Sequence, residues 1–132
     1  MLINSLFIIN KIEELPSTAD CNTPGRYSVS ITLDETHDIF NGHFPGNPIL
    51  PGVCQVEMVR EIAETILENK LMLTQASHVK YLNLLNPMAD PRLQFNLKIG
   101  RNGNDEFDVS AESVSAEKVF MKMKGRMKEQ HN

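Results

Sequence analysis

The side chains of this 132-residue chain that could do chemistry lie within one short segment, GHFPGNPILPGVCQVE, from Gly42 to Glu57. His43 stands just before two turn-forming dipeptides, Pro45-Gly46 and Asn47-Pro48, which bend and stiffen the backbone around it. An imidazole with an ordinary pKa of about 6.5 can act as a base near neutral pH. The segment therefore offers a histidine base that is held in place without a regular element beneath it.

Two further groups follow where a helix is expected to begin. Pro51 suits the first positions of a helix, because the N–H that proline lacks would be unpaired there anyway. Gly52 keeps its N–H and has no Cβ, so a carbonyl oxygen could approach closely, where the helix dipole favours negative charge. Glu57 follows just over one turn later. A base, a backbone donor and a carboxyl are the parts needed to remove a proton alpha to a thioester carbonyl, to stabilise the enolate-like oxygen and to assist loss of a beta hydroxyl.

The rest of the chain predicts one helix among strands. Apolar residues recur at helical spacing from Gly52 to about Asn69, whereas the flanking segments alternate like strands or are broken by turn residues. We expect a strand over Leu2–Leu15, loops over Pro16–Gly25 and Asp34–Gly52, strands over Tyr27–Leu33, Leu71–Leu85, Arg92–Gly100, Glu106–Ser115 and Glu117–Met127, and a hairpin turn at Arg101–Asn104.

This order of elements predicts a single α+β domain over residues 1–132. A helix of about 18 residues spans roughly 27 Å. Such a helix needs one large curved antiparallel sheet to cover its apolar side.

Composition excludes several other classes of protein. With 17 acidic and 13 basic residues the formal net charge is −4, which disfavours nucleic-acid binding. The N-terminus lacks the features of a signal peptide, and no apolar run approaches the roughly 20 residues of a membrane span. Two cysteines and four scattered histidines show no metal-ligand spacing, so we expect no metal and a reducing, cytoplasmic location.

The segment closely resembles the signature of the FabZ/FabA-type 3-hydroxyacyl-ACP dehydratases, small hotdog-fold enzymes of fatty-acid synthesis. That signature has a His-Phe-Pro-Gly turn, a Pro-Gly helix start and an acid fourteen residues after the histidine. His43-Phe44-Pro45-Gly46, Pro51-Gly52 and Glu57 match it at each of those positions. The resemblance extends more weakly over about Tyr27 to Lys128, through the order of strands and the His78-Val79-Lys80-Tyr81 stretch.

The resemblance implies a fold, an activity and a set of roles. It implies a hotdog fold and dehydration of (3R)-3-hydroxyacyl-ACP to trans-2-enoyl-ACP without a cofactor. His43 would abstract the alpha proton, the Gly52 N–H would bind the thioester oxygen and Glu57 would assist departure of the hydroxyl. The partners would be an acyl carrier protein with a phosphopantetheine-linked chain and a second subunit, in a homodimer or a trimer of dimers, with His43 of one subunit meeting Glu57 of the other. We assign substrate contacts to Phe44, Pro45, Gly46, Val53, Cys54 and Glu61.

The match departs from the family at one position. The family usually has glutamine four residues after the catalytic acid, where this chain has Glu61, preceded by Arg60. Periodicity alone would make Glu57 the first member of a solvated stripe with Arg60, Glu61, Glu64 and Glu68. A carboxylate one turn away would raise the pKa of one of the two acids, which either favours a protonated hydroxyl-assisting acid or disturbs the site.

Three alternatives stay open on the sequence. Cys54 could be a nucleophile at the helix start, but a small buried cysteine is the favoured interpretation. Lysines and an arginine on one side of the last strand fit either a wet sheet face or a landing site for an acidic carrier or its phosphate: Lys118, Lys122, Lys124, Arg126 and Lys128. The function itself could instead be that of a hotdog acyl thioesterase, or of a non-catalytic acyl-thioester-binding subunit of a larger synthase.

Overall fold

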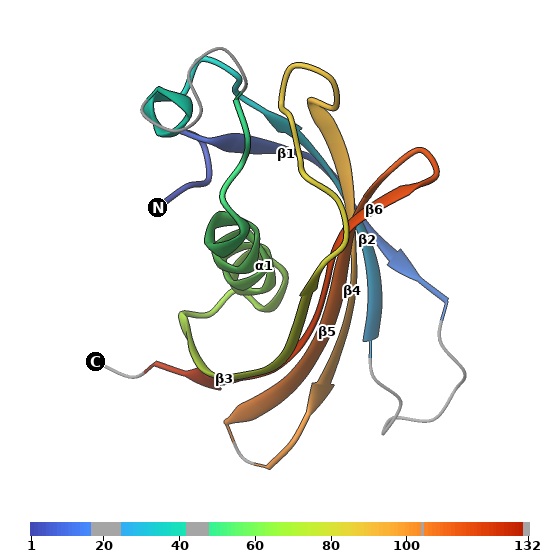
Figure 1. The fold of residues 1–132 in the computed structure, drawn as a ribbon. Helices are drawn as coiled ribbons and strands as arrows, with labels where there is room; N and C mark the ends of the chain where they lie inside the picture. The colour runs from blue at the N-terminus through green and yellow to red at the C-terminus, as the bar shows by residue number, and fades with distance from the viewer. Residues whose placement is uncertain (17–24, 42–47, 104, 131–132) are drawn as a thin grey trace.

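The computed structural model describes residues 1–16, 25–41, 48–103 and 105–130. Six strands and one long helix make up the fold: β1 (Phe7–Leu15), β2 (Gly25–Leu33), α1 (Gly52–Leu67), β3 (Leu71–Tyr81), β4 (Arg92–Arg101), β5 (Glu106–Ser115) and β6 (Lys118–Glu129), with a short 3-10 helix, η1 (Asp38–Phe40), before α1. The strands pair antiparallel in the order β1-β2-β4-β5-β6-β3. Figure 1 shows this sheet curving around α1.

The predicted single helix under one curved antiparallel sheet is therefore confirmed. Residues at helical spacing on α1, among them Met58, Val59 and Ile62, have no exposed surface, and alternate residues of the strands meet them from the sheet. Burying each such side chain contributes about 1.5–3 kcal/mol. The α1 helix is thereby fixed in the hollow of the sheet, so its ends and its open side are the places where it can present functional groups.

Most element boundaries agree with the sequence pattern. The β5 strand has the predicted bounds, and α1 ends at Leu67, where Glu68 turns into the left-handed conformation with φ of 53° and its N–H bonds to the Glu64 carbonyl. The hairpin after β4 has Gly103 at φ of 92°, as the turn composition indicated. Two predicted strands were too long: β1 begins only at Phe7, and β3 ends at Tyr81 rather than Leu85.

The last strand departs from simple alternation. Phe120 and Met121 are both fully buried, because the pairing of β5 with β6 shifts register between Ser113 and Val114. This irregularity separates Lys118 from the lysines that follow it. The nitrogen of Lys118 lies 4.0 Å from an Asp90 carboxylate oxygen, so the basic residues of β6 do not form the single uniform face that alternation predicted.

No helix among the described residues is long and apolar enough to cross a membrane.

Candidate active site

The start of α1 is built as the sequence indicated. Pro51 is the N-cap, with φ of −58° and ψ of 140°, and it supplies no side-chain capping hydrogen bond. Gly52 is the first helical residue, and among the described residues no acceptor receives a hydrogen bond from its backbone N–H. An unpaired N–H at the positive end of a helix is a suitable donor to an oxygen that gains negative charge.

A residue that we did not assign to the site lies directly against Gly52. A Cβ added at Gly52 would fall 2.5 Å from both Cε1 and Cζ of Tyr81 and 3.0 Å from its hydroxyl oxygen. Gly52 is therefore needed here because its missing side chain makes room for the ring. Tyr81 is the last residue of β3 and is 53% exposed. Partial burial raises the pKa of its hydroxyl, which stays protonated and able to donate.

The sequence held one signal for Tyr81, namely its place in the stretch after the helix that resembles the dehydratases. It could not show contact with Gly52, because that contact depends on where β3 ends relative to α1.

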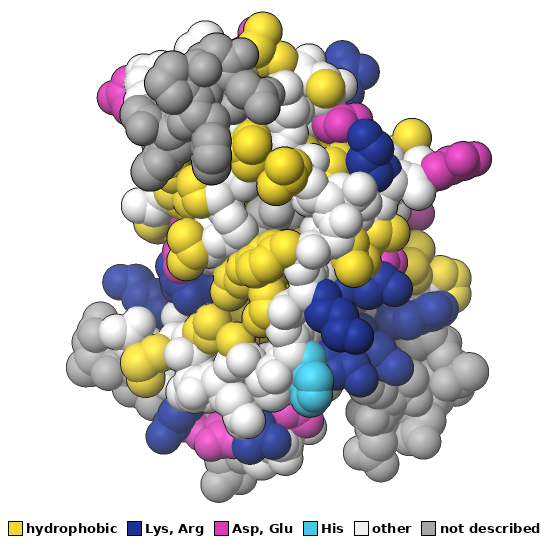
Figure 2. Space-filling view, viewed as in Figure 1, with side chains coloured by type: hydrophobic (Ala, Val, Ile, Leu, Met, Phe, Trp, Pro, Cys, Tyr) yellow, Lys and Arg dark blue, Asp and Glu magenta, His cyan; other side chains and the backbone are white. Residues whose placement is uncertain are grey.

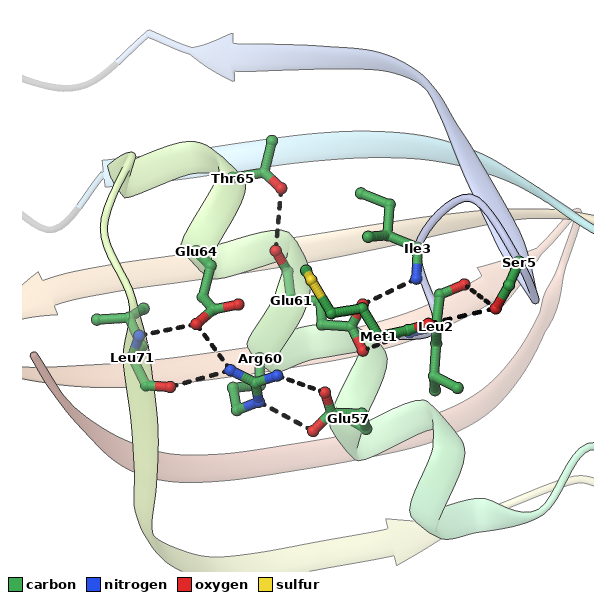
Figure 3. A network of polar contacts seen from close by, with 10 residues as sticks. All are labelled: Met1, Leu2, Ile3, Ser5, Glu57, Arg60, Glu61, Glu64, Thr65 and Leu71. Carbon is green, nitrogen blue, oxygen red and sulfur yellow. Dashed lines mark hydrogen bonds and ion pairs between the residues drawn. The ribbon is translucent and has the colours of Figure 1, made fainter. Parts of the chain in front are cut away.

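The carboxylate of Glu57 is held by an arginine of its own helix. Arg60 donates from Nε to Glu57 Oε1 at 2.9 Å and from Nη2 to Glu57 Oε2 at 2.5 Å, a two-point contact along one edge of the guanidinium. The hydrogen bonds from Arg60 hold the pKa of Glu57 below its ordinary value, although burial opposes them. Figure 3 shows Glu57 turned toward the guanidinium. Glu57 is therefore ionised at neutral pH in this arrangement.

The guanidinium of Arg60 also connects α1 to the start of β3. Arg60 Nη1 lies 2.8 Å from a Glu64 carboxylate oxygen and donates to the carbonyl of Leu71 at 3.0 Å. Glu64 in turn accepts from the N–H of Leu71 at 2.9 Å. Arg60 thus fixes the position of the Glu57 carboxylate relative to Leu71, the first residue of β3. The Glu57 side chain is therefore held in place by the fold and does not move as a free surface side chain would.

Glu61 is buried, and the interpretation as a solvated stripe is wrong for it. Its side chain has no exposed surface, and its two oxygens accept from the N–H groups of Leu2 at 3.0 Å and Ile3 at 2.8 Å. Burial raises the pKa of Glu61, and hydrogen bonding with Glu57 raises it further, while the two amides oppose the shift. Of the two acids, Glu61 has the raised pKa and Glu57 the lowered one, which argues against Glu57 as the protonated acid of the pair in a single subunit.

The remaining candidates at the helix start divide into exposed and buried positions. Val53 is 72% exposed and lies one turn before Glu57, so the two share one face of α1. Cys54 is 7% exposed. Burial raises the pKa of its thiol, and the negative charge of Glu57 raises it further. The thiol is therefore the inert buried group that the sequence favoured, and not a nucleophile.

The histidine turn lies outside the described residues, and with it His43, Phe44, Pro45 and Gly46. Both flanks of that turn are anchored. On one side Phe40 is buried at the end of η1, and on the other the buried Leu50 donates its N–H to the Leu85 carbonyl at 2.8 Å.

The described residues therefore bring some candidates together and separate others. Gly52, Val53, Glu57 and Tyr81 gather around the first two turns of α1. Glu61 lies about 13.5 Å along the helix axis from Gly52 and contacts the N-terminal turn, so its place is behind Glu57 rather than at the helix start. Among the described residues, no group of three or more His, Cys, Asp or Glu is arranged to hold a metal ion.

Comparison with known proteins identifies the family. The model of the ApeI-like family, described as ApeI dehydratase, matches residues 19–122. This chain belongs to the ApeI-like dehydratase family. It is 37% identical over 65 residues to a 3-hydroxyacyl-[acyl-carrier-protein] dehydratase FabZ of Ligilactobacillus salivarius, which covers 47% of this chain and 40% of that protein. It is 34% identical over 97 residues to the FabZ of Wolbachia pipientis wMel, which covers 68% of this chain and 66% of that protein.

A solved structure supports the fold. A chain of the dehydratase heterocomplex ApeI:P from Xenorhabdus doucetiae aligns with a TM-score of 0.61 and 24% identity, over 92% of this chain and 96% of that one. The expected hotdog fold is thus confirmed, and the sequence matches confirm that the chain is related to the FabZ-type dehydratases. The matched regions span only about half the length of the first FabZ relatives.

Proposed function

We propose that this ApeI-like protein removes water from (3R)-3-hydroxyacyl chains carried as thioesters on acyl carrier protein, giving trans-2-enoyl products. The observation that carries the proposal is the start of α1, where the N–H of Gly52 has no acceptor among the described residues and Tyr81 packs against the missing side chain. A donor in that position can stabilise negative charge on the thioester oxygen. The names of the FabZ relatives supply the substrate class.

In the proposed reaction His43 takes the alpha proton, and the electron pair of that C–H bond forms the new double bond. The bond between the beta carbon and the hydroxyl then breaks, and the oxygen leaves as water after receiving one proton. Because Arg60 keeps Glu57 ionised, Glu57 orients the beta hydroxyl by accepting its hydrogen bond, and the protonated His43 returns the proton. No redox step occurs, and the thioester itself makes the alpha proton acidic.

The proposal includes a homodimer in which His43 of one subunit meets Glu57 of the other. Two features support it. The open side of α1 presents the exposed Val53 beside Glu57, and β3 is an edge strand followed by exposed apolar side chains, Leu82 and Leu84 among them. A second copy would cover both. Further assembly into a trimer of dimers and a cytoplasmic location belong to the same proposal.

The test is enoyl formation from 3-hydroxyacyl-ACP, followed by ultraviolet absorbance. We expect turnover by the wild type and at least a hundredfold loss in His43→Ala and Glu57→Gln. Glu68→Gln, the same change on an exposed residue at the far end of α1, is the matched control and should keep full activity.

Two outcomes would redirect the assignment. Release of free thiol without an enoyl signal would favour the thioesterase. Absence of turnover across chain lengths and carriers, with acyl-carrier binding retained, would favour the non-catalytic subunit.

A further inference from the structure

Glu61 is a buried acid that the proposed reaction does not use. Its side chain has no exposed surface, although it belongs to the same helix as Glu57 and follows it by one turn. A carboxyl removed from water is costly to the fold unless its charge is paired or neutralised. The contacts of Glu61 therefore indicate whether the fold accommodates this acid with or without its proton.

The N-terminal turn closes over Glu61. The amides of Leu2 and Ile3 donate to its two oxygens at 3.0 and 2.8 Å, as Figure 3 shows. The turn is itself fixed, because the Leu2 carbonyl accepts from the N–H of Leu6 at 2.7 Å and Leu6 is fully buried. The turn thus shields the carboxyl of Glu61 from water and sets its orientation.

No positively charged side chain balances a charge on Glu61. The guanidinium of Arg60 turns to Glu57 and Glu64. Among the described residues no Lys or Arg forms an ion pair with Glu61, and no charged side chain of the sheet affects its pKa. The amino group of Met1 acts on Glu57 instead. An ionised Glu61 would therefore be a buried charge with two amides to stabilise it, beside the negative charge of Glu57.

The carboxylate of Glu57 is the acceptor that a proton on Glu61 meets. Burial raises the pKa of Glu61 most, and a hydrogen bond between the two acids raises it further. Hydrogen bonds from Arg60 lower the pKa of Glu57 most, and the hydrogen bond with Glu61 lowers it too. Opposite shifts in a pair of acids fit one proton that stays on Glu61 and is donated to Glu57.

We propose that Glu61 is a positioning residue: its carboxyl carries a proton, donates it in a hydrogen bond to the carboxylate of Glu57, and so fixes that carboxylate for the substrate. This rests on the proposed function, in which Glu57 accepts a hydrogen bond from the beta hydroxyl. Arg60 holds Glu57 from Nε at 2.9 Å, and Glu61 holds it from the buried side. The Glu57 side chain is still 37% exposed, so its oxygens can also accept from a substrate hydroxyl.

A second copy of the chain would strengthen this hydrogen bond. Figure 2 shows hydrophobic side chains around the middle of the face that α1 occupies in Figure 1. The proposed dimer would cover that surface and exclude water from Glu57. A hydrogen bond is stronger in such a low-dielectric environment, so the contact between Glu61 and Glu57 should be strongest in the assembled enzyme.

The positioning role makes activity depend on pH in one direction. When pH rises through the raised pKa of Glu61, this acid loses its proton and can no longer donate to Glu57. Two carboxylates then repel each other, and Glu57 leaves its position. We therefore expect kcat to fall as pH rises through the pKa of Glu61.

The first test compares the pH profiles of kcat for the wild type and three variants. Glu61→Gln keeps an N–H donor toward Glu57 and cannot ionise, so the fall in kcat at high pH should disappear, with the maximal kcat within about threefold of wild type. Glu61→Met has a side chain of similar size without a donor, and its kcat should fall at least about tenfold at every pH. Glu68→Gln, on the exposed far end of α1, is the matched control and should keep the wild-type profile.

The second test needs no turnover. An NMR titration of the glutamate carboxyl carbons should show one carboxyl that titrates above the ordinary pKa near 4.5 in the wild type and in Glu68→Gln, and that is absent in Glu61→Gln. In Glu57→Gln the titration of Glu61 should move to lower pH, because the charge that raises its pKa is gone.

Three results would overturn the proposal. One is a fall in kcat at high pH that persists in Glu61→Gln. Another is a Glu61→Met variant as active as Glu61→Gln, or losses in both that only follow their free energies of unfolding, which would make the role structural. The last is a Glu61 carboxyl that titrates at its ordinary value or ignores Glu57→Gln. If the dehydratase assignment itself failed, no protein would turn over substrate, and the NMR titration would still decide whether Glu61 donates to Glu57.

Discussion

Replacement of Gly52 by alanine tests the contact at the centre of the candidate site. The added Cβ would lie 2.5 Å from two ring carbons of Tyr81, whereas such carbon pairs prefer about 3.5–4.0 Å. The ring must therefore retreat by about 1 Å. An overpacked contact of this kind costs about 1–3 kcal/mol, and replacing glycine in a helix returns about 0.5–1 kcal/mol. We expect a net destabilisation of about 1 kcal/mol in Gly52→Ala.

The decisive assay is a double-mutant cycle of Gly52→Ala and Tyr81→Ala, followed by urea unfolding and by enoyl formation. With the ring removed, the alanine at position 52 should be neutral or stabilising, so the two changes should couple by about 1 kcal/mol or more. Alanine keeps the backbone N–H, so the activity lost in Gly52→Ala should be partly restored in the double variant. Stabilities that add within about 0.3–0.5 kcal/mol, with no restored activity, would refute the clash as the reason for glycine.

Three other perturbations follow from the polar contacts. Arg60→Met removes the guanidinium that lowers the pKa of Glu57, so the acid limb of the pH–rate profile should move to higher pH. The wild type should lose free energy of unfolding as pH falls through the lowered pKa of Glu57, and this pH dependence should be smaller in the variant. Glu61→Ala should destabilise by about 3 kcal/mol in chemical unfolding, because it leaves a cavity and leaves the partly buried N–H groups of Leu2 and Ile3 unpaired. Since the pKa of Glu61 is raised, the stability that this carboxyl contributes should be greatest below its ordinary pKa near 4.5 and should decline as pH rises, opposite in sign to Glu57. Ser113→Ala should cost about 1–3 kcal/mol by removing the 2.6 Å hydrogen bond to Gln55, and Gln55→Met in the same background should recover most of it.

The sequence predicted the fold because its signals were local. The alternation over Arg92–Gly100 and the helical period from Gly52 to about Asn69 depend on neighbours in the chain, and both elements lie where expected to within a few residues. The motif also predicted that Gly52 begins the helix. The assignment of His43 and its turn remains a prediction, since those residues lie outside the described part of the chain.

What the sequence could not predict depends on contacts between distant segments. Periodicity placed Glu61 in a solvated stripe. It could not reveal the burial of Glu61, because the N-terminal turn that covers this side chain is nearly sixty residues away along the chain. Tyr81 escaped notice for the same reason. The register of the strands brings Arg26 of β2 beside Lys98 of β4 and places Ser110 of β5 between Lys98 and Lys124, a grouping that no single strand pattern contains; the lysines of β6 alone suggested a stripe along one strand instead.

The order of the strands has a consequence for how the chain folds. The β4, β5 and β6 strands form a meander of adjacent hairpins, whose closure requires only short loops. Strand β3 instead pairs with β6 from far away in sequence, Leu71 meeting Glu129, and such non-local closure is entropically slow. Because Arg60 joins α1 to Leu71 at the start of β3, we expect the helix to take its final position on the sheet when this late pair forms. Helix α1 should therefore be among the last parts to form, and a destabilised variant should release it while the meander of β4, β5 and β6 persists.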